Sequence, residues 1–391
     1  MKKICRKEDC TGCSLCAARC PVKCILMEED AFGHLHPQID QTKCIDCGLC
    51  VKGCPAIHTI EANYPLKAFA GWSKDTVDYQ SSSSGGAASV LSQHIIAEGG
   101  VVYGCSFQPG IHIKHIRVDK IEDLSKLKGS KYVQSNIEDS ISLLKKDVKD
   151  KRPVLFIGTP CQVAAIKQMY KEQPSNLWLV DLICHGVPSE QILTKFITEH
   201  WNINKEDVLS VDFRDDAGFH LIVTLKDGTK LRTTNIWTKR YYDDLYINSF
   251  IDGFTYRESC YTCHYAKPER ISDITIGDFW GLGQNISADE IPIHKHGISC
   301  LLPNTEHGDQ LISELNGKMY LYKRTAEEAI SGNDQLRAPK PINWRIKVFR
   351  KLNESLGFSF RRYQMLTVDK MLYHYMRKEI VKLLTNVKNG H

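Results

Sequence analysis

A cysteine pattern near the start of the chain, repeated once, limits what these residues can fold into. Ten of the 16 cysteines in this 391-residue chain lie between Cys5 and Cys54. The run C-x2-C-x2-C-x3-C-P occurs twice there, at an offset of 34 residues, and its cysteines are Cys10, Cys13, Cys16 and Cys20, then Cys44, Cys47, Cys50 and Cys54. So dense a patch on a long chain is typical of metal ligation rather than of a disulfide framework. The first 60 residues hold too few apolar side chains for a core of their own, so bound metal is expected to stabilise them.

The spacing within each run is that of a bacterial domain with two iron–sulfur clusters. Three closely spaced thiolates wrap one cubane, and the fourth cysteine points away and binds the other cluster. The predicted ligands are therefore Cys10, Cys13, Cys16 and Cys54 for cluster one, and Cys44, Cys47, Cys50 and Cys20 for cluster two. A pair of zinc sites is the alternative, but zinc usually takes its four ligands as two separated pairs. Cys5 and Cys24 lie outside the pattern and are expected not to be ligands.

Four further cysteines form a scattered second set. Cys161 and Cys184 each follow a predicted strand, and Cys260 and Cys263 form a C-x2-C pair. Thiolates are stabilised at helix starts, so these sulfurs are candidates for a third cluster. The residues leave two alternatives open, a zinc site that uses Cys260, Cys263 and His264, or a nucleophilic Cys161. Cys105 and Cys300 are interpreted as core residues.

Strands and helices alternate through the middle of the chain. Strands are predicted over 68–72, 101–107, 111–118, 154–158 and 177–184, and helices over 87–98, 137–149, 162–170 and 189–201. This alternation predicts a mixed or parallel sheet that helices cover on both faces. A strand-rich part follows, with a hairpin signal at Asp227-Gly228. The last 50 residues are expected to be helical and basic, with one apolar stripe at helical spacing: Met365, Val368, Leu372, Met376, Ile380 and Leu384.

Three short segments are candidates for binding a cofactor. Ser81–Gly86 reads SSSSGG and opens a predicted helix, where free backbone N–H groups suit a phosphate, although such a run is also typical of a flexible loop. The turn at 129–132 carries Lys131, which either adds a cation or is simply solvated. The segment 277–281 places two aromatic residues between glycines, which suits a planar ring or core packing equally.

The composition excludes several classes of protein. The hydrophobic fraction is 42% and the charged fraction 25%, which is ordinary for a globular protein, and the net charge of +5 is too small to indicate nucleic acid binding. Neither a signal peptide nor an apolar run of membrane-spanning length is evident. We expect a cytoplasmic protein, with any membrane contact peripheral and its thiols reduced.

The ordered set of segments resembles the coenzyme F420 hydrogenase/dehydrogenase beta-subunit family, in the form that carries a fused ferredoxin domain. The resemblance covers roughly residues 1–330. Its segments are SSSSGGAAS from Ser81, GSKYVQS from Gly129, GTPCQVAA from Gly158, DLICHG from Asp181, FRD from Phe213, CYTC from Cys260, SDITIGDFWG from Ser272 and GISCLL from Gly297.

The resemblance implies FAD in the α/β core, close to a third cluster on Cys161, Cys184, Cys260 and Cys263. The residues that fall on the family's cofactor loops are Ser83, Ser84, Gly85, Gly86, Ser130, Lys131 and Tyr132. It also implies a deazaflavin coenzyme or another hydride carrier at the flavin, and a one-electron protein partner such as ferredoxin or a hydrogenase or dehydrogenase subunit. No catalytic acid or base can be assigned from these residues.

The predicted organisation is therefore an α+β protein of three parts. Residues 1–60 form a ferredoxin domain with two [4Fe-4S] clusters, residues 61–340 a mixed-sheet α/β flavoprotein core, and residues 341–391 a basic helical segment. The predicted function is that of an oxidoreductase that passes electrons between a hydride carrier at FAD and the clusters. Two alternatives stay open, a ferredoxin-dependent reductase of an unidentified metabolite and an electron-transfer subunit of a larger complex.

Overall fold

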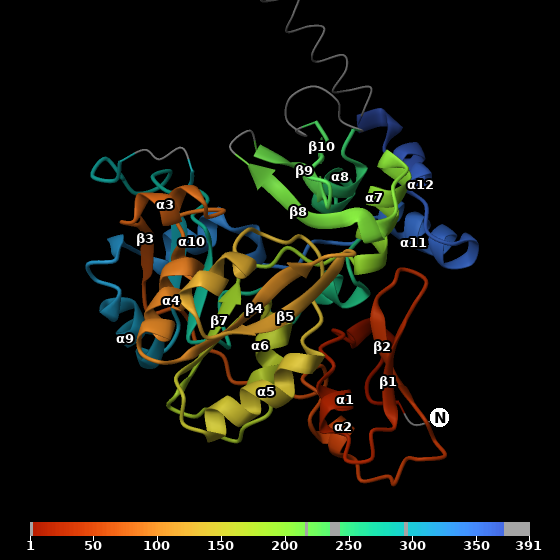
Figure 1. Ribbon diagram of the computed structural model, residues 1–391, viewed down its shortest axis with the longest axis horizontal. Coiled ribbons are helices and arrows are strands. Elements are labelled where there is room, and N and C mark those ends of the chain that lie inside the picture. Colours follow the sequence, from red (N-terminus) through yellow and green to blue (C-terminus); the bar gives the residue numbers. More distant parts are fainter. Residues whose placement is uncertain (1–2, 216–217, 235–242, 293–295, 371–391) are drawn as a thin grey trace, which may run out of the picture.

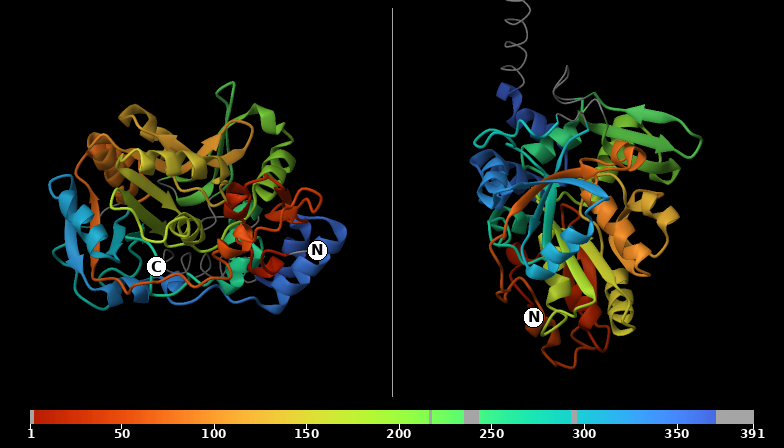
Figure 2. Two further views of the ribbon diagram at one scale, coloured as in Figure 1. Left: turned by 90° about the horizontal axis from the view of Figure 1, so that it is seen from below. Right: turned by 90° about the vertical axis from the view of Figure 1, so that its left-hand side faces the viewer.

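The computed structural model describes residues 3–215, 218–234, 243–292 and 296–370. Three parts can be followed in Figure 1: a small N-terminal module in red, a large sheet with helices around it, and a second small sheet next to the C-terminal helices in blue. The views in Figure 2 show the red module beside both the sheet's helices and the blue helices. This is the mixed α+β architecture that the sequence predicts.

The N-terminal module repeats its backbone as well as its sequence. Its elements are the 3₁₀ turn η1 (Lys7–Asp9), α1 (Leu15–Arg19), β1 (Ile25–Glu29), β2 (Leu35–Ile39) and α2 (Leu49–Lys52). Gly12 and Ser14 have positive φ, and so do Asp46 and Gly48, which stand 34 residues later. Because these residues have a left-handed backbone conformation, each loop turns tightly between successive cysteines. The antiparallel hairpin of β1 and β2 connects the two loops, with a left-handed turn at Gly33.

The central sheet has eight strands in the order β13-β3-β12-β11-β7-β6-β4-β5. The neighbours β4, β6, β7 and β11 are parallel, whereas β5, β12 and β13 pair antiparallel with theirs. The bounds of the strands are β3 Ala68–Ser73, β4 Val101–Gln108, β5 His112–Val118, β6 Val154–Gly158, β7 Leu177–Leu182, β11 Ile274–Asp278, β12 Ser299–Pro303 and β13 Met319–Arg324.

Helices cover both faces of this sheet because successive strand residues point to opposite sides. Val102 packs with one cluster of buried residues, which α4 and α9 complete, while Val101 and Tyr103 pack with another, which α5 and α6 complete. The helices are α3 Thr76–Gln80, α4 Ala87–Ala97, α5 Glu138–Lys149, α6 Pro160–Lys167, α7 Glu190–Trp201, α8 Leu245–Ile251, α9 Glu306–Glu314 and α10 Ala326–Gly332.

The N-terminal module is joined to the core by packing as well as by the chain. Leu15 of α1 is 1% exposed and belongs to the apolar cluster under α5 and α6. The module's own buried cluster is small, and two of its six members are cysteines of the repeated runs, Cys20 and Cys54. The expectation that this module lacks a sufficient core of its own is consistent with this packing.

The small sheet and the C-terminal helices share one apolar cluster. The sheet has the order β10-β9-β8, with β8 at Val208–Asp215, β9 at Gly218–Leu225 and β10 at Lys230–Arg232, and β9 and β10 flank the predicted turn at Gly228. The helices α11 (Trp344–Leu356) and α12 (Phe360–Leu366) bury Phe349 and Phe360 in this cluster, together with Phe32 from the tip of the N-terminal hairpin. The C-terminal helices therefore hold the hairpin against the core.

The predicted apolar stripe of the C-terminal segment is described only in part. Met365 is 76% exposed and Val368 47% exposed. The remaining positions of the stripe, Leu372, Met376, Ile380 and Leu384, lie outside the described residues. Among the helices of the described ranges, none combines the length and the apolar character that crossing a bilayer requires.

Candidate iron–sulfur and cofactor sites

The cysteines of the first run are close to Cys54 of the second run. Burial raises the pKa of the Cys13 thiol to about 11, and the charges of Cys10 and Cys54 add to this rise. Burial also raises the pKa of Cys16, with Cys13 and Cys10 contributing. The four side chains therefore form one group, as the crossover between the two runs predicts.

The cysteines of the second run surround a small cavity. Its volume is about 60 Å³, and its lining includes Cys20, Cys44, Cys47 and Cys50. Cys20 comes from the first run, so each of the two groups contains one cysteine of the other run. Burial raises the pKa of Cys50, and Cys44 and Cys47 add to the rise. A compact apolar space that four thiols surround suits an iron–sulfur cluster better than it suits one of a pair of solvent-exposed zinc sites.

Cys5 and Cys24 contact these two groups without being part of either run. Hydrogen bonds with Cys10 and Cys54 are the largest causes that raise the pKa of Cys5. Cys24 lies 3.5 Å from Cys20, sulfur to sulfur, and lines the small cavity. The expectation that neither residue is a ligand stays a prediction.

The four scattered cysteines come together at the end of the parallel strands. Cys161 is the second residue of α6, directly after β6, and Cys184 follows β7 by two residues. Cys260 lies in the 3₁₀ turn η4 (Glu258–Thr262), and Cys263 follows it. Burial raises the pKa of Cys161 to about 12, and the nearby Cys184 and Cys263 add to it. Burial likewise raises the pKa of Cys184 to about 12, with Cys260 and Cys263 contributing.

These raised pKa values bear on the alternatives for the scattered set. A nucleophilic cysteine needs a lowered pKa, whereas that of Cys161 is raised. In the described part of the chain, no group of three or more His, Cys, Asp or Glu side chains is arranged to hold a single metal ion.

The scattered set is next to cluster one. Cys13 is among the groups that raise the pKa of Cys161. Tyr265 lies at the same boundary, because its pKa, raised mainly by burial, is raised further by Cys161, Cys13 and Cys263. Its hydroxyl donates to the Pro55 carbonyl at 3.4 Å. The two groups of cysteines are therefore neighbours across the junction of the module and the core.

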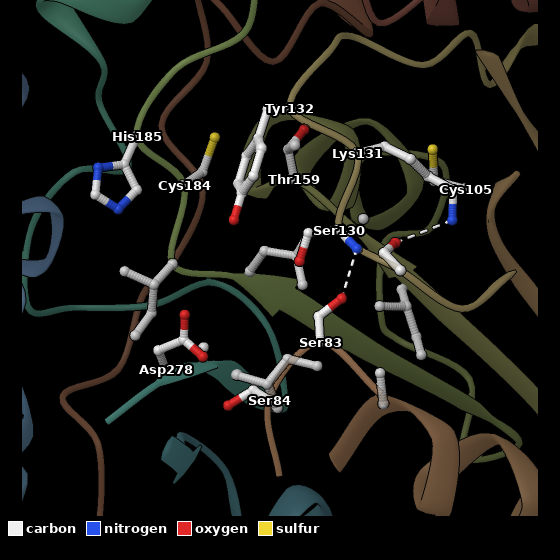
Figure 3. A pocket seen from close by; sticks show the side chains of 18 of the residues that line it. Ser83, Ser84, Cys105, Ser130, Lys131, Tyr132, Thr159, Cys184, His185 and Asp278 are labelled. Atoms are coloured by element: carbon white, nitrogen blue, oxygen red, sulfur yellow. Dashed lines mark hydrogen bonds between the residues drawn. The ribbon is translucent and has the colours of Figure 1, made fainter. Parts of the chain in front are cut away.

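A cavity of about 510 Å³ lies beyond the carboxyl ends of the parallel strands. The open sheets of α/β proteins usually bind ligands at this edge. Six of the seven residues predicted for the cofactor line it: Ser83, Ser84, Gly86, Ser130, Lys131 and Tyr132. Cys184 also lines it, so the cavity borders the scattered cysteines. In the view of Figure 3, Cys184, His185 and Tyr132 lie on one side of the cavity, and Ser83, Ser84 and Asp278 on the other.

Gly85, the seventh residue, does not line the cavity but packs against two strands of the sheet. A Cβ atom on Gly85 would lie 2.1 Å from the Gly71 carbonyl oxygen and 2.6 Å from the Ser299 nitrogen, so only glycine fits between β3 and β12. Gly86, with a φ of +83°, then begins α4. The Ser83 hydroxyl accepts a hydrogen bond of 2.7 Å from the Ser130 N–H (dashed in Figure 3), which joins two of the predicted cofactor segments.

Ser84 indicates that the loop is shaped for a ligand. Its hydroxyl is buried and has no hydrogen-bond partner within the described residues. Buried hydroxyls normally find a partner, and those that do not call for an explanation such as a ligand. The residue lines the cavity at the start of an 11-residue helix, where an anionic group would also be favoured.

Lys131 and Tyr132 contribute a wall rather than a free cation. The Lys131 ammonium donates to the carbonyl oxygens of Leu127, Lys128 and Gly129 at 2.6–3.1 Å. The ring of Tyr132 stacks on Phe250 at 5.2 Å, and burial raises its pKa. Both residues line the cavity, but the lysine is engaged by its own turn.

Comparison with known proteins identifies the two parts of the chain. Residues 151–329 match the family described as the C terminus of the beta subunit of coenzyme F420 hydrogenase/dehydrogenase. Residues 9–57 match a 4Fe-4S dicluster domain. The chain therefore contains a C-terminal domain of the F420 hydrogenase/dehydrogenase beta-subunit family. This confirms the predicted resemblance and the oxidoreductase class, and the dicluster domain supports two [4Fe-4S] clusters and a role in electron transfer.

Individual relatives match either the N-terminal part or most of the chain. Subunit I of NADH-quinone oxidoreductase from Pelobacter propionicus is 39% identical over 57 residues, and a second subunit I from Geobacter metallireducens is 43% identical over 54. These matches cover 12% of this chain and only 31% and 41% of the relatives. An uncharacterized protein of Methanocaldococcus jannaschii is 25% identical over 344 residues, which is 77% of this chain and 84% of that protein.

A solved structure also aligns with part of the chain. A chain of the F420-reducing [NiFe] hydrogenase complex from Methanosarcina barkeri aligns with a TM-score of 0.45 and 19% identity, over 70% of this chain and 91% of its own length.

Several lining residues of the cavity were not named individually as cofactor contacts from the sequence. Thr159, His185 and Asp278 each follow a strand of the parallel set or end one, so their position at strand ends was the available signal. His185 opens onto the cavity, and the surrounding protein lowers its pKa by desolvation. Arg214 of β8 donates to Asp278 at 3.1 Å and so connects the small sheet to the cavity edge.

The two aromatic residues of the segment 277–281 differ in their surroundings, and each fits one of the two interpretations, core packing or a cofactor site. Phe279 is 7% exposed and belongs to a buried cluster. Trp280 is 50% exposed and lines the cavity. The segment therefore contributes one residue to the core and one to the site.

Proposed function

We propose that the chain is an iron–sulfur flavoprotein that passes electrons between a hydride carrier at FAD and a one-electron protein partner. One observation carries the proposal, a continuous series of neighbours. Cys184 lines the 510 Å³ cavity and belongs to the group of Cys161, Cys260 and Cys263. Cys161 in turn neighbours Cys13 of the N-terminal module. Cavity, core cysteines and module therefore follow one another without a gap.

In this proposal each group of residues has a separate task. Ser83, Ser84 and Gly86 bind the flavin at the start of α4, and Tyr132 forms a wall of the cavity. A flavin supplies a centre that exchanges two electrons as hydride and single electrons with clusters. Cys161, Cys184, Cys260 and Cys263 hold a third [4Fe-4S] cluster beside it. A deazaflavin coenzyme is the proposed hydride carrier, because the family is named for it.

The far side of the module is the proposed exit for electrons. Cys47 is exposed, and around the small cavity Ile45 is 62% exposed and Leu49 37% exposed. Lys23 and Lys52 are exposed next to this surface and form no ion pair with the described residues. An apolar patch with basic neighbours fits an acidic one-electron carrier such as a ferredoxin.

The flavin part of the proposal has a direct test. Protein purified without oxygen should be brown and should release yellow flavin on acid precipitation, and reduced deazaflavin coenzyme should bleach the bound flavin. Ser84→Ala should weaken flavin binding roughly fivefold, because one hydrogen bond contributes about 1 kcal/mol.

Ser81→Ala is the matched control for this variant. It lies in the same loop, but its hydroxyl donates to the Val77 carbonyl and it does not line the cavity. Iron-loaded protein that releases no flavin would refute FAD. Equal weakening by both serine variants would contradict the role of Ser84.

A further inference from the structure

Arg257 connects the core cysteines to cluster one. It stands three residues before Cys260, whose N–H donates to the Arg257 carbonyl oxygen at 3.0 Å. Its side chain runs into the N-terminal module, where Nε donates to the Cys10 carbonyl oxygen at 2.6 Å and Nη2 lies 3.6 Å from the Cys10 sulfur. The residue is 1% exposed.

This buried guanidinium has no carboxylate partner within the described ranges. Among the ion pairs of the described residues none includes Arg257, and its other hydrogen bonds go to the Leu35 carbonyl and the Gln134 side chain, with the His36 ring 3.4 Å away. A buried charge normally requires an opposite charge nearby, because removing it from water costs several kcal/mol. The Cys10 thiolate, carrying part of the negative charge of its cluster, is the anion within reach.

The two halves of the module differ at this point. Gly12 makes room for the guanidinium, because a Cβ atom there would lie 2.6 Å from Nη1 of Arg257. The equivalent residue of the second run is Asp46, which is exposed. No hydrogen bond from an arginine to Cys44, the counterpart of Cys10, occurs within the described part of the chain. The module is thus symmetric in its ligands and asymmetric in the charge around them.

We propose that Arg257 is a positioning residue that raises the reduction potential of cluster one relative to cluster two. The inference rests on the proposed function, since it takes Cys10 as a ligand. A cluster held by Cys10 would gain one negative charge on reduction, and the adjacent Arg257 guanidinium would stabilise that charge. Net charge and hydrogen bonds to the sulfurs are known to set cluster potentials. Cluster one is then the preferred acceptor for electrons that leave the core.

The test is a redox titration of the iron-loaded full chain, followed by electron paramagnetic resonance. Arg257→Gln removes the charge but keeps an amide, and the potential of cluster one should fall while those of the other clusters stay in place. The signal of cluster one is identified as the one that Cys13→Ala removes. Arg257→Lys keeps the charge and should retain most of the wild-type potential.

Arg19→Gln is the matched control, because Arg19 also joins the module to the core, through the Gln168 carbonyl at 3.2 Å, and no hydrogen bond from its side chain to a cysteine sulfur occurs in the described residues. It should move the potential of cluster one less than Arg257→Gln does. An unmoved cluster-one potential in Arg257→Gln, with all clusters present, would overturn the proposal and leave the proposed function intact. If Arg257→Gln loses the cluster, Arg257→Lys decides: loss of the cluster there too would show that Arg257 is needed for folding rather than for the potential.

Discussion

The two groups of cysteines are encoded in different ways. In the N-terminal module the ligands of both predicted clusters lie within 45 residues, and left-handed residues at Gly12, Ser14, Asp46 and Gly48 shape both loops alike. In the core, Cys161, Cys184 and the pair of Cys260 and Cys263 come from three separate connections around the sheet. A local run specifies its site almost by itself, whereas the core site exists only when the parallel strands are in register.

The two groups of cysteines also differ in what lies next to them. The module's second group opens to the surface at Cys47, while Cys184 of the core group lines a cavity between elements far apart in the chain. In the proposed function, the core group faces the substrate side and the module faces the partner side. Variants in each group should separate these two tasks.

The largest expected effect is at the core group. Wild-type protein reconstituted without oxygen should bind about twelve irons, and Cys161→Ala should bring this to about eight, because three thiolates generally do not retain a cubane. Flavin should stay bound and reducible, but electrons from the hydride carrier should no longer reach an added one-electron acceptor. Iron analysis and acceptor reduction provide the measurement.

Cys300→Ala is the control for this change, because Cys300 is fully buried in β12. It should leave the iron content as it is. About eight irons in both wild type and Cys161→Ala would show that the core holds no cluster. One zinc per chain, lost when Cys260 is replaced, would favour the zinc alternative.

The second effect separates the two clusters of the module. Cys13→Ala and Cys47→Ala should each remove about four irons. Both should slow reduction of one-electron acceptors, while direct reduction of the flavin persists, since neither residue lines the cavity. Electron paramagnetic resonance should show a different cluster missing in each variant.

Cys24→Ala is the comparison for these variants. Although Cys24 touches Cys20, it is predicted not to be a ligand, so both clusters should remain. Loss of a cluster in Cys24→Ala would contradict this prediction. Loss of FAD in both Cys13→Ala and Cys47→Ala would show that the module and the core do not function separately.

The smallest effect is expected at the exit surface. Replacing Lys52 by Glu should raise the KM for an acidic ferredoxin by up to about fivefold at low salt, because exposed charge pairs contribute up to about 1 kcal/mol. The difference should disappear at high ionic strength. Lys351→Glu, on the exposed side of α11, should change nothing. Equal effects of both variants would indicate net charge rather than a docking surface.

Much of the core's secondary structure was predictable from local pattern. The strand over 154–158 has the predicted bounds, and α4 and α5 differ from their predicted ranges by one residue at one end, because buried strands and amphipathic helices have clear periodicity. The strand β13 and the helices α8, α9 and α10 were not predicted. The strand β13 lies at the edge of the sheet and has mixed exposure, which weakens its periodic signal.

The sequence by itself determined the module's two cysteine groups, the strand–helix alternation and the loops that border the cavity, because each depends on residues close together in the chain. The tertiary structure alone decided which neighbours these features acquire. The strand order places Cys161 and Cys184 just after two adjacent strands, β6 and β7. The packing of Leu15 brings Cys13 to Cys161, and the fold carries Arg257 to Cys10 across 247 residues. Such contacts depend on long-range packing, which leaves no periodic trace in the chain.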